Sequence, residues 1–337
     1  MKDLLHYDLT AHNTFGIHAH CRRFIEYASA EDAVQIASML TPDDMPLLII
    51  GEGSNLLLRG DFEGTVIHAA VRGCTVLDRG VDVLLRCGAG DTVDDIIDHA
   101  ITQGWHGAEN LSLIPGEVGA SAVQNIGAYG VEVCELIHTV EAVDLSTGEL
   151  TTIPASDCQY AYRDSRFKHE WKNRFLITHV TYRLSKQFTP RLDYGNIRSF
   201  LQEKGCDEPT ARQLRDAIIA IRRDKLPDVK VIGNAGSFFV NPVVPRSLFV
   251  KLQQQYPDMP HYEVGTDRVK IPAGWLIQQC GWKGRNLGRA GVYERQALIL
   301  VNRGGATGED IFRLCEAIRQ DVFTRFGITI RPEVNIV

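Results

Sequence analysis

Blocks of apolar residues over positions 24–71 predict strands that alternate with a helix. Ser29 and Asp32 form a helix N-cap pair, and the apolar residues after them recur at helical spacing up to Leu40. The run 46–50 predicts a buried strand that ends in a glycine-rich turn, and residues 65–71 predict another strand. This part of the chain is therefore expected to form a small α/β unit.

The pattern changes near residue 72 and favours a mixed α+β arrangement. Residues 81–87 predict a strand, and the helix after it is capped by Thr92 and ended by Gly104. A hairpin with a Ser-Thr-Gly turn is predicted over 140–152, and another alternating strand over 175–184.

Two prolines mark the end of this region. A helix that starts at Pro209 ends before Pro227, because proline stops a helix. The changes in pattern predict three domains, at 1–72, 73–226 and 227–337, and an α+β fold class.

The last of these domains has its own pattern. It begins with a Gly/Asn-rich loop at 233–242 and contains a predicted helix near 273–280. A final helix carries an apolar face from Ile311 to Val322, and residues 328–330 predict a strand.

Composition narrows the class of protein. The chain has 337 residues, 44% hydrophobic and 23% charged, with a net charge of -6 and no basic tail. This balance is typical of a soluble globular protein and argues against a nucleic-acid binder. No stretch approaches the roughly 18 apolar residues needed to span a membrane, and the N-terminus lacks a signal-peptide core, so we expect a cytoplasmic protein.

Metal and disulfide chemistry receive little support. The eight cysteines are scattered without CxxC spacing, which is typical of buried thiols in a reducing compartment. His18 and His20 could chelate a metal, but no further ligand cluster surrounds them, so no metal is expected.

The first candidate for chemistry is the turn Gly51-Glu52-Gly53-Ser54-Asn55. A strand that runs into such a turn can present backbone N–H groups to a phosphate. The turn lacks the third glycine of the dinucleotide-binding fingerprint, so an ordinary turn is the alternative.

A second candidate is the Gly- and Ala-rich segment 115–130. Missing side chains let a backbone approach a flat ligand closely. We expect a long loop without regular structure, which is usually functional, and a packed Ω-loop is the alternative.

Three further segments are weaker candidates. Basic and aromatic residues interleave over 162–168, where Arg163 could hold a carboxylate or phosphate, unless this is a solvated turn. Ser237 follows a small flexible turn and precedes two aromatic residues, so it could be a positioned proton donor or nucleophile, or part of a plain turn. Nothing local marks Glu333 as catalytic.

Taken together and in order, these segments resemble the family of UDP-N-acetylenolpyruvoylglucosamine reductases over almost the whole chain. The motifs that carry the resemblance are NTFG (13–16), GEGSN (51–55), IPG…QNIGAYG (114–130), YRDSRFK (162–168), LDYGNI (192–197), KLPD (225–228), GNAGSFFVNP (233–242), AGWLIQQCGWKG (273–284), QALILVN (296–302) and PEV (332–334). The segment around Tyr194 together with YRDSRFK points to the branch of the family with an extra tyrosine loop.

The resemblance implies a fold and two redox partners. Residues 1–72 and 73–226 would form an FAD-binding module of the vanillyl-alcohol-oxidase type, and 227–337 a substrate-binding domain. FAD would be held without a covalent bond, and NADPH would be the co-substrate. The residues implied to bind FAD are Gly51, Gly53, Ser54 and Asn55 at the pyrophosphate, and Pro115, Gly116, Gly119, Ala120, Gln124, Asn125, Gly127, Ala128 and Tyr129 at the flavin.

The resemblance also implies a reaction. NADPH reduces FAD and leaves, and the reduced flavin then passes hydride to the vinyl carbon of the enolpyruvyl sugar nucleotide, giving UDP-N-acetylmuramate for peptidoglycan synthesis. Arg163 and Glu333 would stabilise the resulting carbanion, and Ser237 would protonate it. Tyr194, Lys225, Asn241 and Gln296 would hold the diphosphate of the substrate. NADPH would use the same pocket in turn, and the protein would act as a monomer.

Two alternatives remain open. One is an FAD oxidase of the same superfamily, which would use oxygen, although the PEV and GNAGSFF motifs argue against it. The other is a sugar-nucleotide binder without activity, which would be free to lose one of the three catalytic residues. Two departures from the expected family pattern are Glu117 in the flavin segment and the short tail after Val334.

Overall fold

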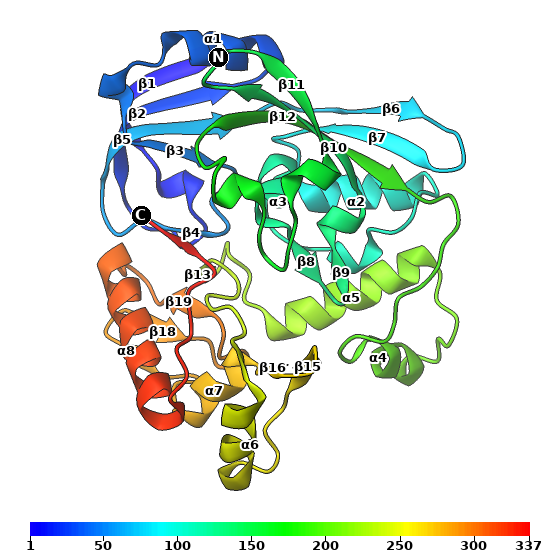
Figure 1. Ribbon diagram of the computed structural model, residues 1–337, viewed down its shortest axis with the longest axis vertical. Helices are drawn as coiled ribbons and strands as arrows, with labels where there is room; N and C mark the ends of the chain where they lie inside the picture. The colour runs from blue at the N-terminus through cyan, green and yellow to red at the C-terminus, as the bar shows by residue number, and fades with distance from the viewer. The chain divides into compact units, whose positions relative to one another are not determined.

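The computed structural model describes residues 1–337, which divide into two compact units. The first unit comprises Met1–Tyr7, Cys21–Glu52 and Glu63–Asp224. The second comprises Asp8–His20, Gly53–Phe62 and Lys225–Val337. Each unit therefore draws on segments that are far apart in the sequence, as the colours of Figure 1 show.

The first unit contains a four-stranded sheet in the order β1-β2-β5-β3. Its strands are β1 (Lys2–Asp8), β2 (His20–Tyr27), β5 (Phe62–Ala69) and β3 (Leu47–Ile50), and β3 runs parallel to β5. Helix α1 (Ala30–Met39) begins as predicted, because the Ser29 side chain accepts a hydrogen bond from the Asp32 N–H at 3.1 Å.

A second sheet of the first unit has the order β11-β10-β12-β7-β6 and is antiparallel throughout. Its strands are β11 (Leu150–Pro154), β10 (Ile137–Asp144), β12 (Phe175–Leu184), β7 (Val83–Gly88) and β6 (Cys74–Asp78). The predicted hairpin is the pair β10 and β11, and the predicted strand 175–184 is β12. The helices and the small hairpin of this part are α2 (Val93–Thr102), α3 (Val118–Gln124), β8 (Gly127–Ala128), β9 (Val131–Glu132), α4 (Ile197–Glu203) and α5 (Ala211–Lys225).

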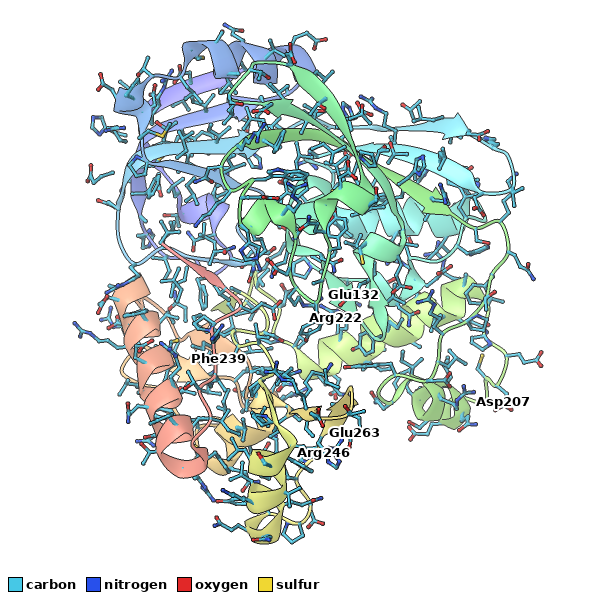
Figure 2. The ribbon with its side chains drawn as sticks, viewed as in Figure 1. Glu132, Asp207, Arg222, Phe239, Arg246 and Glu263 are labelled. Atoms are coloured by element: carbon cyan, nitrogen blue, oxygen red, sulfur yellow. The ribbon has the colours of Figure 1, made fainter.

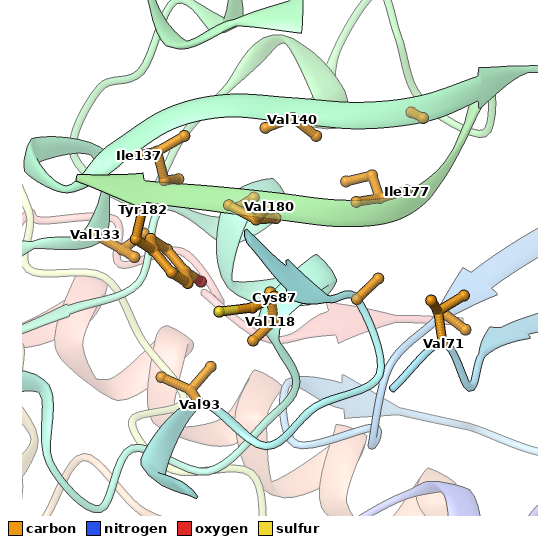
Figure 3. Close-up of a cluster of buried hydrophobic side chains, with 14 of the residues drawn as sticks. Val71, Cys87, Val93, Val118, Val133, Ile137, Val140, Ile177, Val180 and Tyr182 are labelled. Atoms are coloured by element: carbon orange, nitrogen blue, oxygen red, sulfur yellow. The ribbon is translucent and has the colours of Figure 1, made fainter. Parts of the chain in front are cut away.

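One apolar core joins the two sheets of the first unit with α1, α2 and α3, while α4 and α5 share a separate cluster. Figure 3 shows side chains of β10 and β12, among them Val140, Val180 and Tyr182, around Cys87 of β7 and Val118 of α3. Burial of each such side chain contributes about 1.5–3 kcal/mol to folding. The core thereby fixes α3, and with it the Gly- and Ala-rich segment, against the sheet.

The second unit contains three small sheets. The first has the order β13 (Gly233–Asn234), β19 (Leu300–Asn302), β18 (Ala290–Val292) and β17 (Asn286–Leu287). The second has the order β14 (Val243–Pro245), β16 (Arg268–Lys270) and β15 (Tyr262–Val264). In the third, β4 (Leu56–Leu57) pairs in parallel with β20 (Asn335–Ile336).

Three helices complete the second unit: α6 (Arg246–Gln255), α7 (Ala273–Gln279) and α8 (Gly308–Phe326). Helix α8 buries the apolar face predicted from Ile311 to Val322. Thr307 and Asp310 form a capping box at its start, and Gly327 ends it in the left-handed region at φ 65°. No helix of the chain combines the length and the apolarity needed to cross a bilayer.

The α+β fold class is confirmed, but two local predictions are wrong. The segment 115–130 is not a loop without regular structure, since it contains α3 and the strand β8, which pairs with β9 directly after the segment. Residues 328–330 form no strand, because Ile328 and Ile330 are buried in the core of the second unit without a ladder partner. The three predicted domains stay a prediction. The boundary at 226 lies beside the division between Asp224 and Lys225, whereas the two units do not divide at 72.

Candidate active site

The turn 51–55 follows β3 and spans the boundary between the units. Gly53 has φ 75°, and a Cβ there would lie 2.0 Å from the carbonyl oxygen of His12, so no other residue fits. The Thr14 N–H donates to the Gly53 carbonyl at 3.3 Å. Asn55 accepts a hydrogen bond from the Asn335 N–H at 3.1 Å. Hydrogen bonds to two backbone carbonyl groups of the turn therefore fix it to the neighbouring segments.

The start of the segment 115–130 lies against the turn after β7. The Val118 N–H donates to Asp91 at 2.9 Å and the Gly119 N–H to Ala89 at 2.8 Å. A Cβ at Gly119 would lie 2.9 Å from the Cβ of Ala89, and one at Gly51 would lie 3.0 Å from that of Ala120. Small residues are thus required for the backbone segments to approach one another this closely.

The end of the same segment is shaped by Asn125 and a tight hairpin. Asn125 is fully buried in the left-handed region at φ 47°. Its side chain donates to Glu132 at 3.0 Å and to the Ala161 carbonyl at 2.8 Å. Tyr129 and Gly130 both have positive φ, at 49° and 79°, as a type I′ hairpin turn requires.

The side chain of Arg163 lies against this hairpin. Its guanidinium donates to the carbonyl of Asn125 at 3.3 Å and to the carbonyl of Gly127. Its own carbonyl accepts a hydrogen bond from the Lys168 ammonium at 2.7 Å. The structure therefore brings a predicted catalytic residue together with the predicted flavin segment.

Arg222 of α5 is a site residue that the sequence reasoning missed, and Figure 2 marks it and Glu132 of β9. Its Nε atom is buried without a hydrogen-bond partner. Burial lowers the pKa of Arg222, and the charge of Arg163 lowers it further, while Tyr129 opposes the shift. The sequence carries no signal that sets Arg222 apart from the neighbouring Arg223.

Tyr194 lies against the same hairpin, in the first unit. Its ring contacts that of Tyr129 edge to face, with centroids 6.5 Å apart and an angle of 89°. The Tyr129 carbonyl in turn accepts a hydrogen bond from Asn110 at 2.9 Å. The side chain of Tyr194 is half exposed.

In the second unit, Ser237 and Glu333 lie on neighbouring extended segments. The Glu333 N–H donates to the Phe238 carbonyl at 2.8 Å, and Phe239 forms a β-bridge with Pro332. Phe238 and Phe239 are buried and anchor the segment in the core, whereas Ser237 is exposed and Glu333 half-buried. The fold thus brings the backbone segments that carry Ser237 and Glu333 side by side, although they are far apart in the sequence.

The other predicted substrate residues of the second unit have structural roles as well. The side-chain oxygen of Asn241 accepts a hydrogen bond from the Ala273 N–H at 2.9 Å and so caps the start of α7. That of Gln296 accepts one from the Leu298 N–H at 3.3 Å. Lys225 is exposed at the end of α5. These residues belong to the same unit as Ser237, and Arg163 and Tyr194 to the other.

The residues present fit FAD. The buried Nε of Arg222 is a donor without an acceptor, and a flavin ring or an anion would supply one. The glycines of the segment 115–130 leave its backbone free of side chains beside Arg163. The side chain of Asn125 is already hydrogen-bonded within the protein, so its contact with a flavin would be through the backbone.

Two family models match the chain. Residues 22–154 match an FAD binding domain. Residues 227–337 match the C-terminal domain of UDP-N-acetylenolpyruvoylglucosamine reductase.

Relatives named UDP-N-acetylenolpyruvoylglucosamine reductase match over nearly the full length. The one from Bacteroides fragilis is 51% identical over 332 residues, 98% of this chain and 99% of the relative. Those from Porphyromonas gingivalis and Azoarcus sp. are 47% and 46% identical over 98% and 97% of this chain, and over 98% and 95% of the relatives.

A solved structure confirms the fold. The crystal structure of UDP-N-acetylenolpyruvylglucosamine reductase from Thermus caldophilus superimposes with a TM-score of 0.69 at 20% identity, over 99% of this chain and 98% of that one. The chain is an FAD-dependent oxidoreductase and belongs to the UDP-N-acetylenolpyruvoylglucosamine reductase family.

Proposed function

We propose that this protein reduces UDP-N-acetylglucosamine enolpyruvate to UDP-N-acetylmuramate with NADPH as the hydride donor. The observation that carries the proposal is the near-full-length likeness to reductases of this name. When bound, FAD supplies the redox chemistry, since it takes hydride from NADPH and passes it on to the enolpyruvyl group.

The cofactor would be held by two backbone segments. Gly51, Gly53, Ser54 and Asn55 would bind its pyrophosphate, which a turn of small residues can approach closely. The flavin would lie along the residues from Pro115 to Tyr129. The hydrogen bonds between Gly119 and Ala89 and between Arg163 and Asn125 support this assignment, because they fix both ends of the segment.

Arg163, Ser237 and Glu333 would act on the substrate. Hydride addition to the vinyl carbon breaks the C=C π bond and leaves an electron pair on the neighbouring carbon, delocalised into the carboxylate. Arg163 would stabilise this charge, an effect typically worth about 100-fold or more in rate. Glu333 would donate a hydrogen bond to this charge, which requires a protonated carboxyl group, because an ionised carboxylate only accepts.

Ser237 would complete the reduction. Its hydroxyl proton would pass to the carbon that carries the electron pair, so that one hydride and one proton are added across the double bond. Serine is a weak acid and must therefore be positioned by the fold. The anchoring of its segment by Phe238 and Phe239 supports this role.

Substrate recognition would use polar side chains. Tyr194, Lys225, Asn241 and Gln296 would hold the diphosphate, because one point charge with neutral donors permits release of the product. NADPH would occupy the same pocket before the substrate. We further propose that the protein is a cytoplasmic monomer, and its eight free cysteines are consistent with a reducing compartment.

An anaerobic assay tests the reaction. NADPH oxidation is followed with and without UDP-N-acetylglucosamine enolpyruvate, and we expect turnover only when the sugar nucleotide is present. If flavin is bound but the sugar nucleotide accelerates nothing, the substrate assignment fails and an oxidase reaction becomes the leading alternative.

A further inference from the structure

A buried cluster of charged side chains lies in the first unit, around His68 of β5. The Nε2 atom of His68 is 3.2 Å from a carboxylate oxygen of Glu117, and its Nδ1 atom is 3.1 Å from a carboxylate oxygen of Glu26. All three side chains are largely buried. Glu117 is the departure from the family pattern noted in the sequence.

The positions of the two carboxylates favour the positively charged form of His68. A neutral imidazole has one N–H, so it could donate to only one of the two carboxylates and would set its lone pair against the other. An imidazolium donates to both. Burial opposes the charge, but the hydrogen bonds and charges of Glu117 and Glu26 raise the pKa of His68 above its ordinary value.

The cluster lies beside the turn proposed to hold the pyrophosphate. His68 is in register with Ile50, the last residue of the parallel strand β3, and Gly51 follows directly. A Cβ at Gly51 would lie 3.1 Å from a carboxylate oxygen of Glu117. Glu117 is itself the N-cap residue of α3 and forms a β-bridge with Thr92. A carboxylate is therefore built into the place where a diphosphate is expected.

We propose that His68 is a positioning residue for the cofactor, whose imidazolium neutralises Glu117 so that the turns at 51–55 and 115–120 can accept the diphosphate of FAD. This inference rests on the proposed function. An uncompensated carboxylate would repel a diphosphate across a few ångströms of water-poor space. The same contacts tie β5 to the start of the flavin segment, 49 residues further along the chain.

The other charges around His68 do not replace it. Lys2 of β1 pairs with Glu26 at 2.5 Å, and Arg72 approaches Glu117 at 3.7 Å. Both cations are more than half exposed, so solvent screens them. Tyr27 of β2, the remaining titratable group near Glu117, stays neutral because burial raises its pKa. His68 is the buried cation of the cluster.

FAD affinity should depend on pH through the charge of His68. Because the folded pKa of His68 is raised, its charge is fully present below its ordinary pKa and is lost as pH rises through the raised value. FAD affinity should therefore fall with rising pH in that window. Glu117→Gln should weaken the dependence and move it to lower pH, because no carboxylate then faces the diphosphate when His68 loses its proton and only Glu26 still raises the pKa of His68.

The experiment measures FAD binding to the apoprotein by quenching of flavin fluorescence between pH 6 and pH 9. For the wild type we expect the Kd to rise about tenfold, the effect of one pKa unit of charge interaction. The His68→Gln variant should bind FAD weakly at every pH. The double variant with both His68→Gln and Glu117→Gln should recover most of the wild-type affinity. Thermal unfolding of each apoprotein shows which variants are folded.

His179→Gln is the matched control, since His179 of β12 is a half-buried histidine of the same unit that lies beside Arg86 and Glu141. Its FAD affinity should follow the wild type. An unchanged pH dependence in Glu117→Gln overturns the proposal even if His68→Gln does not fold. If the wild type binds no FAD at any pH, the proposed function fails instead.

Discussion

The backbone N–H of Glu333 donates a hydrogen bond to the carbonyl of Phe238 at 2.8 Å, and the residue before Phe238 is Ser237. This bond belongs to a short bridge in which Val240 also donates to Arg331 at 3.0 Å. The backbone segments that carry two residues proposed to act on the substrate are therefore fixed to one another by hydrogen bonds.

Ser237→Ala should separate the two halves of the reaction. Reduction of the flavin by NADPH needs no proton from Ser237 and should keep its rate. Reoxidation by the enolpyruvyl sugar nucleotide should slow by about 100-fold or more, since a positioned proton donor is lost. Anaerobic stopped-flow absorbance measures both steps.

The control for this variant is Ser247→Ala, which alters an exposed serine of the same unit on α6. Both of its half-reactions should match those of the wild type. A Ser237→Ala protein with an unimpaired second step would remove Ser237 from the mechanism.

Arg222→Met should stabilise the empty protein and weaken ligand binding. The substitution removes a half-buried cation whose buried Nε has no hydrogen-bond partner and which lies near the like charge of Arg163. Such a charge costs stability unless an anion or acceptor meets it. We expect the Tm of the apoprotein to rise, and the Kd for FAD or for the enolpyruvyl sugar nucleotide to rise as well.

Arg223→Met is the matched comparison, because the neighbouring side chain is exposed. It should change neither the Tm nor the affinities appreciably. A lower Tm for Arg222→Met with unchanged affinities would show that Arg222 serves the fold alone.

Strongly periodic elements of this fold could be predicted from the sequence. The apolar face of α8 and the Ser29 cap of α1 are local patterns, and both are present. The helix α3 escaped prediction because Gly119 and its small neighbours carry no apolar stripe. Its position is set by contacts with Ala89 and Asp91, which are distant in sequence.

The residues of the candidate site could also be predicted from the sequence only in part. Ser237 and Glu333 could be named because they stand in short motifs of a recognisable family. Arg222 could not be distinguished from Arg223, since only the packing of α5 near Tyr129 buries one of the two. The pairing of His68 with Glu117 was equally out of reach, because it depends on how β5 meets the start of α3.

Acid should destabilise the first unit through the pair of Asp144 and Arg174. The hydrogen bond from Arg174 lowers the pKa of Asp144 to about 2. A lowered carboxyl pKa contributes stability above its unfolded value near 4, which is lost as pH falls towards 2. Because Arg174 is half exposed, we expect a contribution of only about 1 kcal/mol.

Urea unfolding of the wild type and of Asp144→Asn across pH 2 to pH 7 measures this contribution. The two should differ at neutral pH and converge near pH 2. A difference that stays constant with pH would mean that Asp144 acts through its hydrogen bonds to Ser146 and not through its charge.

Gly53→Ala should disrupt the turn that is proposed to hold the pyrophosphate. The added methyl group would lie 2.0 Å from the carbonyl oxygen of His12, and alanine disfavours φ 75°. We expect a loss of stability of at least about 1–3 kcal/mol, the usual cost of such a backbone conformation, together with loss of bound FAD. Gly60→Ala serves as the control, because a Cβ there meets no atom within 4 Å and its φ is not positive. Thermal unfolding measures the stability of both variants, and the flavin-to-protein absorbance ratio measures their bound FAD. Normal flavin content in Gly53→Ala would show that the turn adapts and that its glycine is not required for the cofactor.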